Sequence, residues 1–120
     1  MEPIVPVTVK PAVSMDVFAR LDLRVGTIER VEDVERSKKL VKLTVNFGDH
    51  SRQVLVGMKG ERQDPREIQG RQALFVVNLE PRQMMGERSE AMLLDIGSAD
   101  GLTPALAVPE RALPNGTRAG

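Results

Sequence analysis

The chain lacks cysteine, tryptophan and tyrosine, and its 120 residues include only three phenylalanines and one histidine. Without cysteine there is no disulfide framework, no thiol nucleophile and no thiolate metal site. This absence is typical of proteins kept in a reducing compartment, so we expect a cytoplasmic location. The shortage of aromatic rings argues against a protein that stacks the bases of single strands on aromatic platforms.

Long apolar runs are also missing. No stretch approaches the roughly 18 apolar residues that a membrane span requires. Residues 1–10 lack the basic region and the continuous apolar stretch of a secretory signal. The sequence therefore predicts neither a membrane span nor an export signal. A length of 120 residues, with 41% hydrophobic residues, is typical of one folded domain with a single core.

The chain has no excess of either charge, because 17 basic residues balance 17 acidic ones. Neutrality is unusual for a nucleic-acid-binding domain, since most such domains are basic as a whole. It does not exclude that function, because local clusters of charge set the potential near a binding surface.

Residues that would support catalysis or metal binding are scarce. His50 follows Gly48 and Asp49 in a predicted hairpin turn, where a solvated side chain is the usual outcome. The sequence contains no nucleophile elbow, no phosphate-cradling glycine loop and no zinc or calcium motif. We therefore predict no catalytic residue, no metal site and no cofactor.

Residues 1–14 are predicted to form an extended arm that precedes a folded domain of residues 15–120. Pro3, Pro6 and Pro11 forbid a regular helix in the arm and disfavour a central strand. The alternating apolar residues between these prolines suggest that the arm lies against another surface, such as a partner subunit.

Strand patterns dominate the rest of the chain. A single helical turn capped by Ser14 or Asp16 is expected first. Apolar residues alternate most clearly over 40–47, and a break in the alternation at Gly26 predicts a β-bulge. Residues 64–70 predict a short helix with a capping box and a terminal glycine. The expected strands are 21–31, 40–47, 51–56, 72–79 and 90–96. Five strands with a short helix between the third and fourth match the OB-fold, a partly open Greek-key barrel.

A basic run, residues 36–42, combines four positive charges with no acidic residue. Ser37 offers a hydroxyl to a phosphate or sugar, and Lys38, Lys39 and Lys42 supply charge. Because Lys42 alternates with apolar neighbours, it should project from the polar face of its strand. An ordinary solvated loop would have the same composition, so this run by itself leaves both interpretations open.

The loop of residues 81–89 joins two predicted strands and is rich in long side chains. Arg82 and Arg88 carry forked guanidinium groups that suit phosphate or guanine. Met84 and Met85 are adjacent and cannot both turn inward from one strand. At least one of them should therefore be exposed or covered by a partner, where a methionine packs adaptably on a base or a peptide.

Asn78 and Ser89 bracket this loop, and two roles are open to them. As structural residues they would satisfy backbone groups where the strands separate. In a functional interpretation, Ser89, Glu90 and Met92 present a hydroxyl, a carboxylate and a thioether to exposed bases.

Four segments resemble motifs of the tRNA-binding OB-fold family, whose members occur as free-standing proteins, at the C-terminus of methionyl-tRNA synthetases and as CsaA-type export chaperones. The segments are F-A-R-L-D-L-R-V-G-T-I at 18–28, S-K-K-L at 37–40, Q-V-L-V-G-M at 53–58 and N-L-E-P-R-Q-M-M-G-E-R-S-E-A-M-L-L at 78–94. The resemblance implies an OB-fold that recognises tRNA by its structure, commonly as a homodimer.

The resemblance also implies RNA-contacting positions, which are Ser37, Lys39, Asn78, Arg82, Ser89 and Met92. The chain departs from the family pattern at three places. Lys38 stands where many members have aspartate, which favours phosphate. Gln83 replaces a frequent lysine, and Ala91 replaces a frequent glycine, so its methyl group would weaken a close approach of RNA. Together with the residues chosen on chemistry, the candidate RNA-binding set is Ser37, Lys38, Lys39, Lys42, Asn78, Arg82, Ser89, Glu90 and Met92.

The sequence therefore predicts a non-catalytic, structure-specific tRNA-binding protein, and it leaves two alternatives open. An apolar groove with Met84, Met85 and Met92 would suit a CsaA-like chaperone that binds unfolded peptides. A module that only dimerises, without binding RNA, is the other alternative. The expected partners are tRNA and a second copy of the chain, with an aminoacyl-tRNA synthetase or an unfolded peptide as further candidates.

Overall fold

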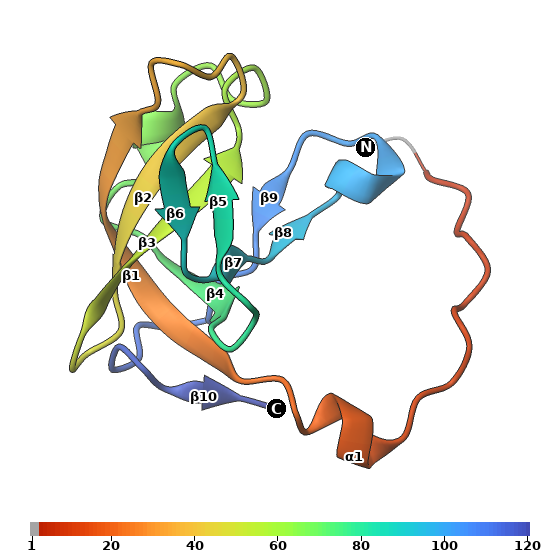
Figure 1. Cartoon of the computed structure of the whole chain (residues 1–120). Helices are drawn as coiled ribbons and strands as arrows, with labels where there is room; N and C mark the ends of the chain where they lie inside the picture. Colours follow the sequence, from red (N-terminus) through yellow and green to blue (C-terminus); the bar gives the residue numbers. More distant parts are fainter. Residues whose placement is uncertain (1–2) are drawn as a thin grey trace.

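The structure, a computed structural model, describes residues 3–120 and consists mainly of antiparallel β-strands with little helix (Figure 1). The prediction of a mainly β chain is confirmed. The described residues form ten strands where five were predicted, because the second half of the chain is divided into short pieces. The elements are α1 (Met15–Phe18), β1 (Leu23–Asp33), β2 (Leu40–Asn46), β3 (Ser51–Gly57), η1 (Pro65–Ile68), β4 (Gln72–Val76), β5 (Arg82–Met84), β6 (Glu87–Ser89), β7 (Met92–Leu93), β8 (Asp95–Ile96), η2 (Ser98–Asp100), β9 (Ala105–Leu106) and β10 (Arg118–Ala119).

The main sheet has the strand order β3-β2-β1-β4-β7, and β10 also pairs with β1. β5 pairs with β6, and β8 pairs with β9, in two separate ribbons. The 11-residue strand β1 serves two neighbours: residues 23–27 pair with β4, and residues 27–33 pair with β2. β1 is therefore the strand on which the rest of the sheet is assembled.

The bend in β1 lies slightly further along the chain than predicted. Its pairing with β2 changes register between Ile28 and Arg30, not at Gly26. Gly26 is required for a different reason, because a Cβ atom there would lie 2.5 Å from Val45 Cγ1 and 2.8 Å from Phe47 Cε1. The glycine thus permits close packing of β1 on β2, and the register shift three residues later produces the irregularity.

The core is formed largely by the alternating apolar residues that the sequence indicated on β2. Leu43 and Val45 are fully buried, and Phe47 meets Phe75 edge to face with 5.4 Å between ring centroids. The largest fully buried side chains are Phe75, Ile28, Leu43, Ile68, Val45 and Val54. This core joins β1 to β4, and the polar side of β2 and β3 faces the β5–β6 ribbon.

The two short helices predicted from capping residues are both present. Ser14 caps α1, and its hydroxyl accepts a hydrogen bond from the helix backbone at 3.2 Å. η1 is a 3₁₀ helix between β3 and β4, and Asp64 accepts from Arg66 N at 3.0 Å. The predicted capping box is not formed, because Glu67 pairs with Arg62 at 2.6 Å.

The two ends of the main sheet approach each other. Glu90 N donates to the carbonyl oxygen of Gln53 at 2.9 Å, and Leu55 N donates to Ser89 Oγ at 3.0 Å. These bonds hold the end of β6 against β3, although residues 53–55 and 89–90 are more than thirty positions apart in the chain.

Residues 3–13 form neither helix nor strand, and Figure 1 shows this segment curving away from the sheets before it meets α1. Val5 and Val9 are 90% and 91% exposed, so the segment has no packed apolar side along most of its length. Residues 1 and 2 of the predicted arm lie outside the described residues. Across residues 3–120, no helix is long and apolar enough to span a membrane.

Candidate nucleic-acid interface

The basic run predicted to bind phosphate lies in the connection between β1 and β2. Lys38 and Lys39 are exposed on it. The Ser37 hydroxyl accepts from Lys39 N at 3.1 Å and from Leu40 N at 2.9 Å, so it shapes the entry to β2. Lys59 Nζ donates to the carbonyl oxygen of Ser37 at 2.6 Å and also pairs with the carboxylate of Asp33. Lys59 thus holds the loop on its inner side, and Lys38 and Lys39 remain exposed at the surface.

Lys42 occupies the polar face of β2, as the alternation predicted, and this face meets the β5–β6 ribbon. Lys42 Nζ lies 3.4 Å from Glu87 Oε1. Gln53, on the adjacent strand β3, donates from Nε2 to the other oxygen of Glu87 at 2.9 Å. Lys42, Gln53 and Glu87 therefore form one polar cluster across three strands.

Residues 81–89 were predicted as a loop, but most of them form a β-hairpin. The turn between β5 and β6 consists of Met85 at φ +52° and Gly86 at φ +79°. Two successive residues in the left-handed region are typical of a two-residue hairpin turn, although methionine is rarely found there. Met85 is 49% exposed, which confirms that at least one of the adjacent methionines points outward. Arg82 and Arg88 are also exposed.

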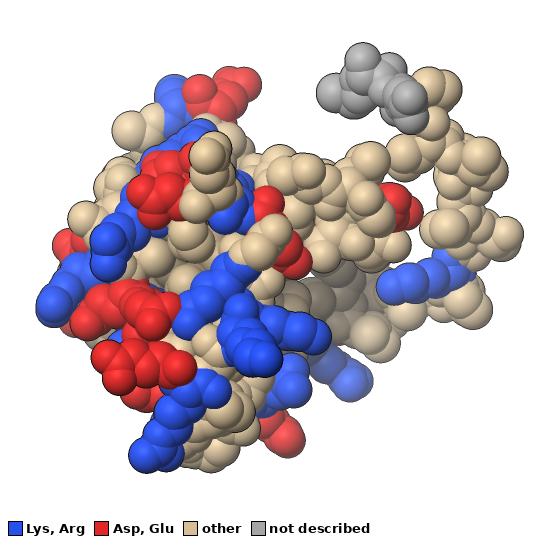
Figure 2. Space-filling model, turned by 90° about the horizontal axis from the view of Figure 1, so that it is seen from above, with Lys and Arg blue, Asp and Glu red and all other residues tan. Residues whose placement is uncertain are grey.

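A cleft of about 380 Å³ separates the hairpin turn from the β1–β2 connection. Its lining residues are Asp33, Val34, Glu35, Arg36, Met85, Gly86 and Glu87. The cleft places the two segments proposed to contact RNA on opposite walls of one depression. Figure 2 shows acidic and basic side chains intermixed over the face that it presents, so the neutral composition is reflected on this surface.

Ser89 and Glu90 fasten the hairpin to the sheet. Ser89 is 7% exposed, and its hydroxyl donates to the carbonyl oxygen of Ala91 at 3.2 Å while accepting from Leu55 N. The Glu90 carboxylate accepts from Gln53 N at 3.1 Å. Both side chains thus have the structural role considered for Ser89, and the Ser89 hydroxyl is directed inward.

Asn78 has a similar structural role at another place. Its Oδ1 accepts from Asp22 N at 2.8 Å, and its Nδ2 donates to the carbonyl oxygen of Arg20 at 2.6 Å. These bonds tie the end of β4 to the connection between α1 and β1. Met92, on β7, is 45% exposed and pairs with Val76 of β4. The Asn78 side chain bonds to neither the hairpin nor the β1–β2 connection. It therefore lies apart from the candidate residues on those two segments.

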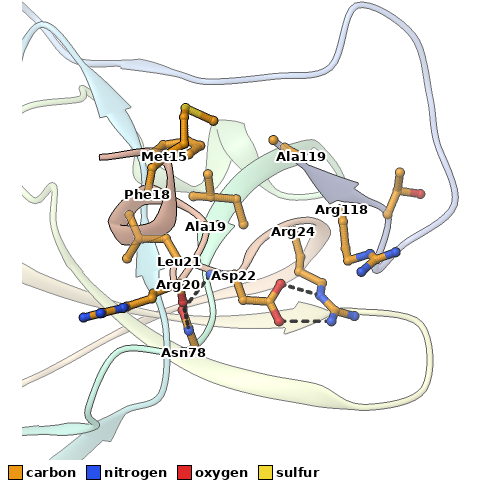
Figure 3. A pocket seen from close by; sticks show the side chains of 13 residues that line it. Met15, Phe18, Ala19, Arg20, Leu21, Asp22, Arg24, Asn78, Arg118 and Ala119 are labelled. Atoms are coloured by element: carbon orange, nitrogen blue, oxygen red, sulfur yellow. Dashed lines mark hydrogen bonds and ion pairs between the residues drawn. The ribbon is translucent and has the colours of Figure 1, made fainter. Parts of the chain in front are cut away.

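Figure 3 shows the pocket beside Asn78, which has a volume of about 890 Å³. Arg24 donates from Nε and Nη2 to the two carboxylate oxygens of Asp22, at 2.8 Å and 3.0 Å. This hydrogen-bonded guanidinium holds the pKa of Asp22 below its usual value. Apolar side chains of α1 line the same pocket, among them Met15 and Phe18.

Three residues that hold the β1–β2 connection and the β5–β6 hairpin in place were not selected from the sequence. They are Lys59, Gln53 and Arg52. Arg52 Nη1 donates to the carbonyl oxygens of Val77 and Glu90, at 2.5 Å and 3.0 Å, and so joins the end of β4 to the end of the hairpin. For Arg52 and Gln53 the only signal was a polar residue on a predicted strand, and Lys59 lies in the turn after β3.

His50 is part of the same network. Its Nε2 lies 3.0 Å from Arg52 Nε, and its Nδ1 lies 2.6 Å from Asp49 Oδ1. The hydrogen bond from His50 holds the pKa of Asp49 below its usual value. Residues 3–120 contain no group of three or more histidine, aspartate or glutamate side chains placed to hold a metal ion.

Comparison with known proteins identifies relatives of the chain. Residues 23–118 match the family model described as "Putative tRNA binding domain". The chain is 45% identical over 92 residues to the methionine–tRNA ligase of Chlorobium chlorochromatii, covering 77% of this chain and 13% of that protein. It is 40% identical over 106 residues to the corresponding ligase of Methanococcus maripaludis, covering 88% of this chain and 16% of that protein. The chain therefore spans only a small part of these enzymes.

The chain also matches solved structures, and these matches extend over the whole length of the other chain. A MetRS-related protein from Pyrococcus horikoshii has a TM-score of 0.84 and 32% identity, covering 92% of this chain and 100% of that one. The chaperone CsaA from Bacillus anthracis has a TM-score of 0.77 and 28% identity, with the same coverage.

Proposed function

Because the chain belongs to the tRNA-binding domain family, we propose that it is a non-catalytic module that recognises tRNA by its structure, through phosphates and exposed bases. The observation that carries this proposal is the cleft between the β1–β2 connection and the β5–β6 hairpin. One wall belongs to the connection that carries Lys38 and Lys39, and the other belongs to the hairpin that carries Arg82 and Arg88, although none of these four side chains lines the cleft itself. The charged residues that line the cleft are Asp33, Glu35, Glu87 and Arg36, so a phosphate backbone would contact the exposed cations of the two segments outside it.

The proposed fold of this module is the five-stranded OB-type barrel of residues 15–120, preceded by the arm of residues 1–14. The hydrogen bonds that bring residues 89 and 90 against β3 support this proposal. In it, β6 and β7 act as one interrupted strand between β4 and β3. The groove of an OB-fold binds oligonucleotides on the face formed by its second and third strands and the adjoining loops, which here are β2, β3 and the cleft.

The roles of the candidate residues follow from their contacts. We assign direct phosphate contacts to Lys38, Lys39, Lys42 and Arg82, and base contact to Met92. Four other candidates hydrogen-bond backbone groups through their side chains: Ser37, Asn78, Ser89 and Glu90. We propose that they position the segments that contact RNA, and that exposed backbone groups beside them contact RNA as well. An aminoacyl-tRNA synthetase in the cytoplasm is the partner that would gain tRNA affinity from such a module.

A gel-shift comparison tests the proposal. Total tRNA should retard the protein, whereas single-stranded DNA of equal length should not do so at the same protein and salt concentrations. Equal retardation of both would contradict recognition of tRNA structure, because a simple cationic surface binds any polyanion.

We further propose that the module is a homodimer. Met15 is 77% exposed beside the pocket near Asn78, and Val5 and Val9 of the arm are almost fully exposed. Exposed apolar side chains that line one pocket, as Met15 and Phe18 do, are typical of protein–protein contact surfaces. Deleting residues 1–13 should shift the protein from dimer towards monomer in analytical ultracentrifugation, while the Ser14 cap of α1 is kept. An undeleted chain of residues 1–120 that is monomeric at micromolar concentration would contradict the proposal.

A CsaA-like chaperone function is the second candidate, favoured by the similarity to CsaA and by the exposure of Met85 and Met92. Binding of an apolar peptide should be insensitive to salt, and tRNA should displace the peptide if both use one face. A dimer that binds neither ligand would instead indicate a module that serves only for dimerisation.

A further inference from the structure

The carboxylate of Glu87 occupies a position that suits a phosphate. One of its oxygens faces Lys42 Nζ at 3.4 Å, and the other accepts from Gln53 Nε2 at 2.9 Å. A cation and an amide donor directed at two oxygens of one anion would serve a phosphate group equally well. The Lys42 and Glu87 side chains are 24% and 35% exposed, so the cluster is sheltered but open to solvent on one side.

We propose that Glu87 is an internal competitor for an RNA phosphate at Lys42 and Gln53. This inference rests on the proposed tRNA-binding function and assigns Glu87 a role in setting the affinity of the same site. In the unbound protein, Glu87 neutralises Lys42. When RNA binds, a phosphate takes the place of the carboxylate, and the Glu87 side chain turns away.

The surroundings of Glu87 permit this exchange. Its ion pair with Lys42 is longer than the 2.7–2.9 Å or so of a tight charge-assisted hydrogen bond. Glu87 also lines the cleft of about 380 Å³, which gives its side chain space to move into. Arg36 lines the same cleft and offers a cation to the displaced carboxylate, whereas Asp33 and Glu35 on that wall oppose its approach.

The exchange would set a threshold on affinity. Every polyanion that uses Lys42 must displace Glu87 at the same cost, so the ratio of two such affinities is unchanged. A polyanion with few other contacts is then held too weakly to remain bound, whereas a ligand that engages the rest of the site stays bound.

The variant Glu87→Gln tests the inference, with Glu80→Gln as the matched control. Both substitutions remove one negative charge from the segment around the hairpin, and the glutamine at position 87 keeps an oxygen for Gln53. Glu80 is exposed and makes no ion pair with another described residue. At low salt, E87Q should bind tRNA about fivefold more tightly, the equivalent of about 1 kcal/mol for releasing a partly exposed ion pair. Its log–log salt slope should stay close to that of the unsubstituted protein, because a phosphate is neutralised at Lys42 in both. A gain in affinity no larger than that of E80Q would overturn the inference.

A Lys42→Gln background provides the decisive comparison. If Glu87 acts through Lys42, the gain produced by E87Q should disappear when Lys42 is absent. A gain that persists would show a general charge effect and would also overturn the inference.

In the unsubstituted protein, the side-chain carboxyl ¹³C resonance of Glu87 should shift on titration with tRNA, while that of Glu80 should not. Failure of the proposed function is distinguishable, because the unsubstituted protein would then not bind tRNA at all.

Discussion

Replacing Lys38 and Lys39 together by glutamine is expected to weaken tRNA binding about 30-fold at low salt, or about 2 kcal/mol for two phosphate contacts. Both side chains are exposed on the β1–β2 connection, beside the cleft that separates it from the hairpin. The log–log salt slope should become shallower by about 1.4 to 1.8, because two fewer phosphates are neutralised. Fluorescence anisotropy with labelled tRNA over a series of salt concentrations measures both quantities.

The matched control for this pair removes the same charge elsewhere. Lys10, on the N-terminal segment, and Arg71, before β4, are exposed cations outside the proposed site. Changing both to glutamine should leave the affinity and the salt slope close to those of the unsubstituted protein. If the two double variants lose affinity equally, binding depends on total charge and the assigned position of the site is wrong.

The variant Ser89→Ala is expected to lower the free energy of unfolding by about 1 to 3 kcal/mol, because Leu55 N would remain buried without a hydrogen-bond partner. The Ser89 hydroxyl is the acceptor for this group and also donates to the Ala91 carbonyl oxygen. Urea unfolding monitored by circular dichroism measures the change. Ser51→Ala, at an exposed position on β3, should change the stability by less than about 0.5 kcal/mol.

The same variant separates the two interpretations of Ser89. With the hydroxyl directed inward, S89A should bind tRNA almost normally at a temperature where it remains folded. Normal stability combined with a strong loss of tRNA affinity would mean that the hydroxyl contacts RNA directly.

The elements that the sequence predicted well are those with local signals. The alternation along β2 and the capping residues Ser14 and Asp64 are readable from neighbouring residues, and the structure confirms each of them. The β5–β6 hairpin was predicted as a loop because both of its strands are short and largely exposed, so there is no apolar alternation to detect. Its turn also places Met85 in the left-handed region, which methionine seldom adopts.

The first strand shows how one glycine can be misinterpreted. The break in alternation near Gly26 was attributed to a bulge at the glycine, but the register shift lies between Ile28 and Arg30. The shift follows the fully buried Ile28 and falls at the two consecutive exposed residues Glu29 and Arg30. Gly26 is explained by the proximity of Val45 and Phe47, which depends on how two strands pack and not on the strand itself.

The sequence selected the regions of the candidate site but not the contacts within them. Sequence reasoning selected residues 37–42 and 78–92, and the structure brings parts of both together through Lys42 and Glu87. It did not identify Gln53, because the bonds of that residue to the hairpin join positions more than thirty residues apart. It also could not decide that Asn78 and Ser89 are engaged by the backbone, since this requires knowledge of which strand lies opposite.

The salt dependence of tRNA binding by the unsubstituted protein tests the central claim most directly. Four cationic contacts, at Lys38, Lys39, Lys42 and Arg82, predict a log–log slope of about −3 for the association constant against salt concentration. A filter-binding series from low to moderate salt should give this slope with total tRNA. A slope near zero would contradict the account, because binding would then not depend on neutralising phosphates.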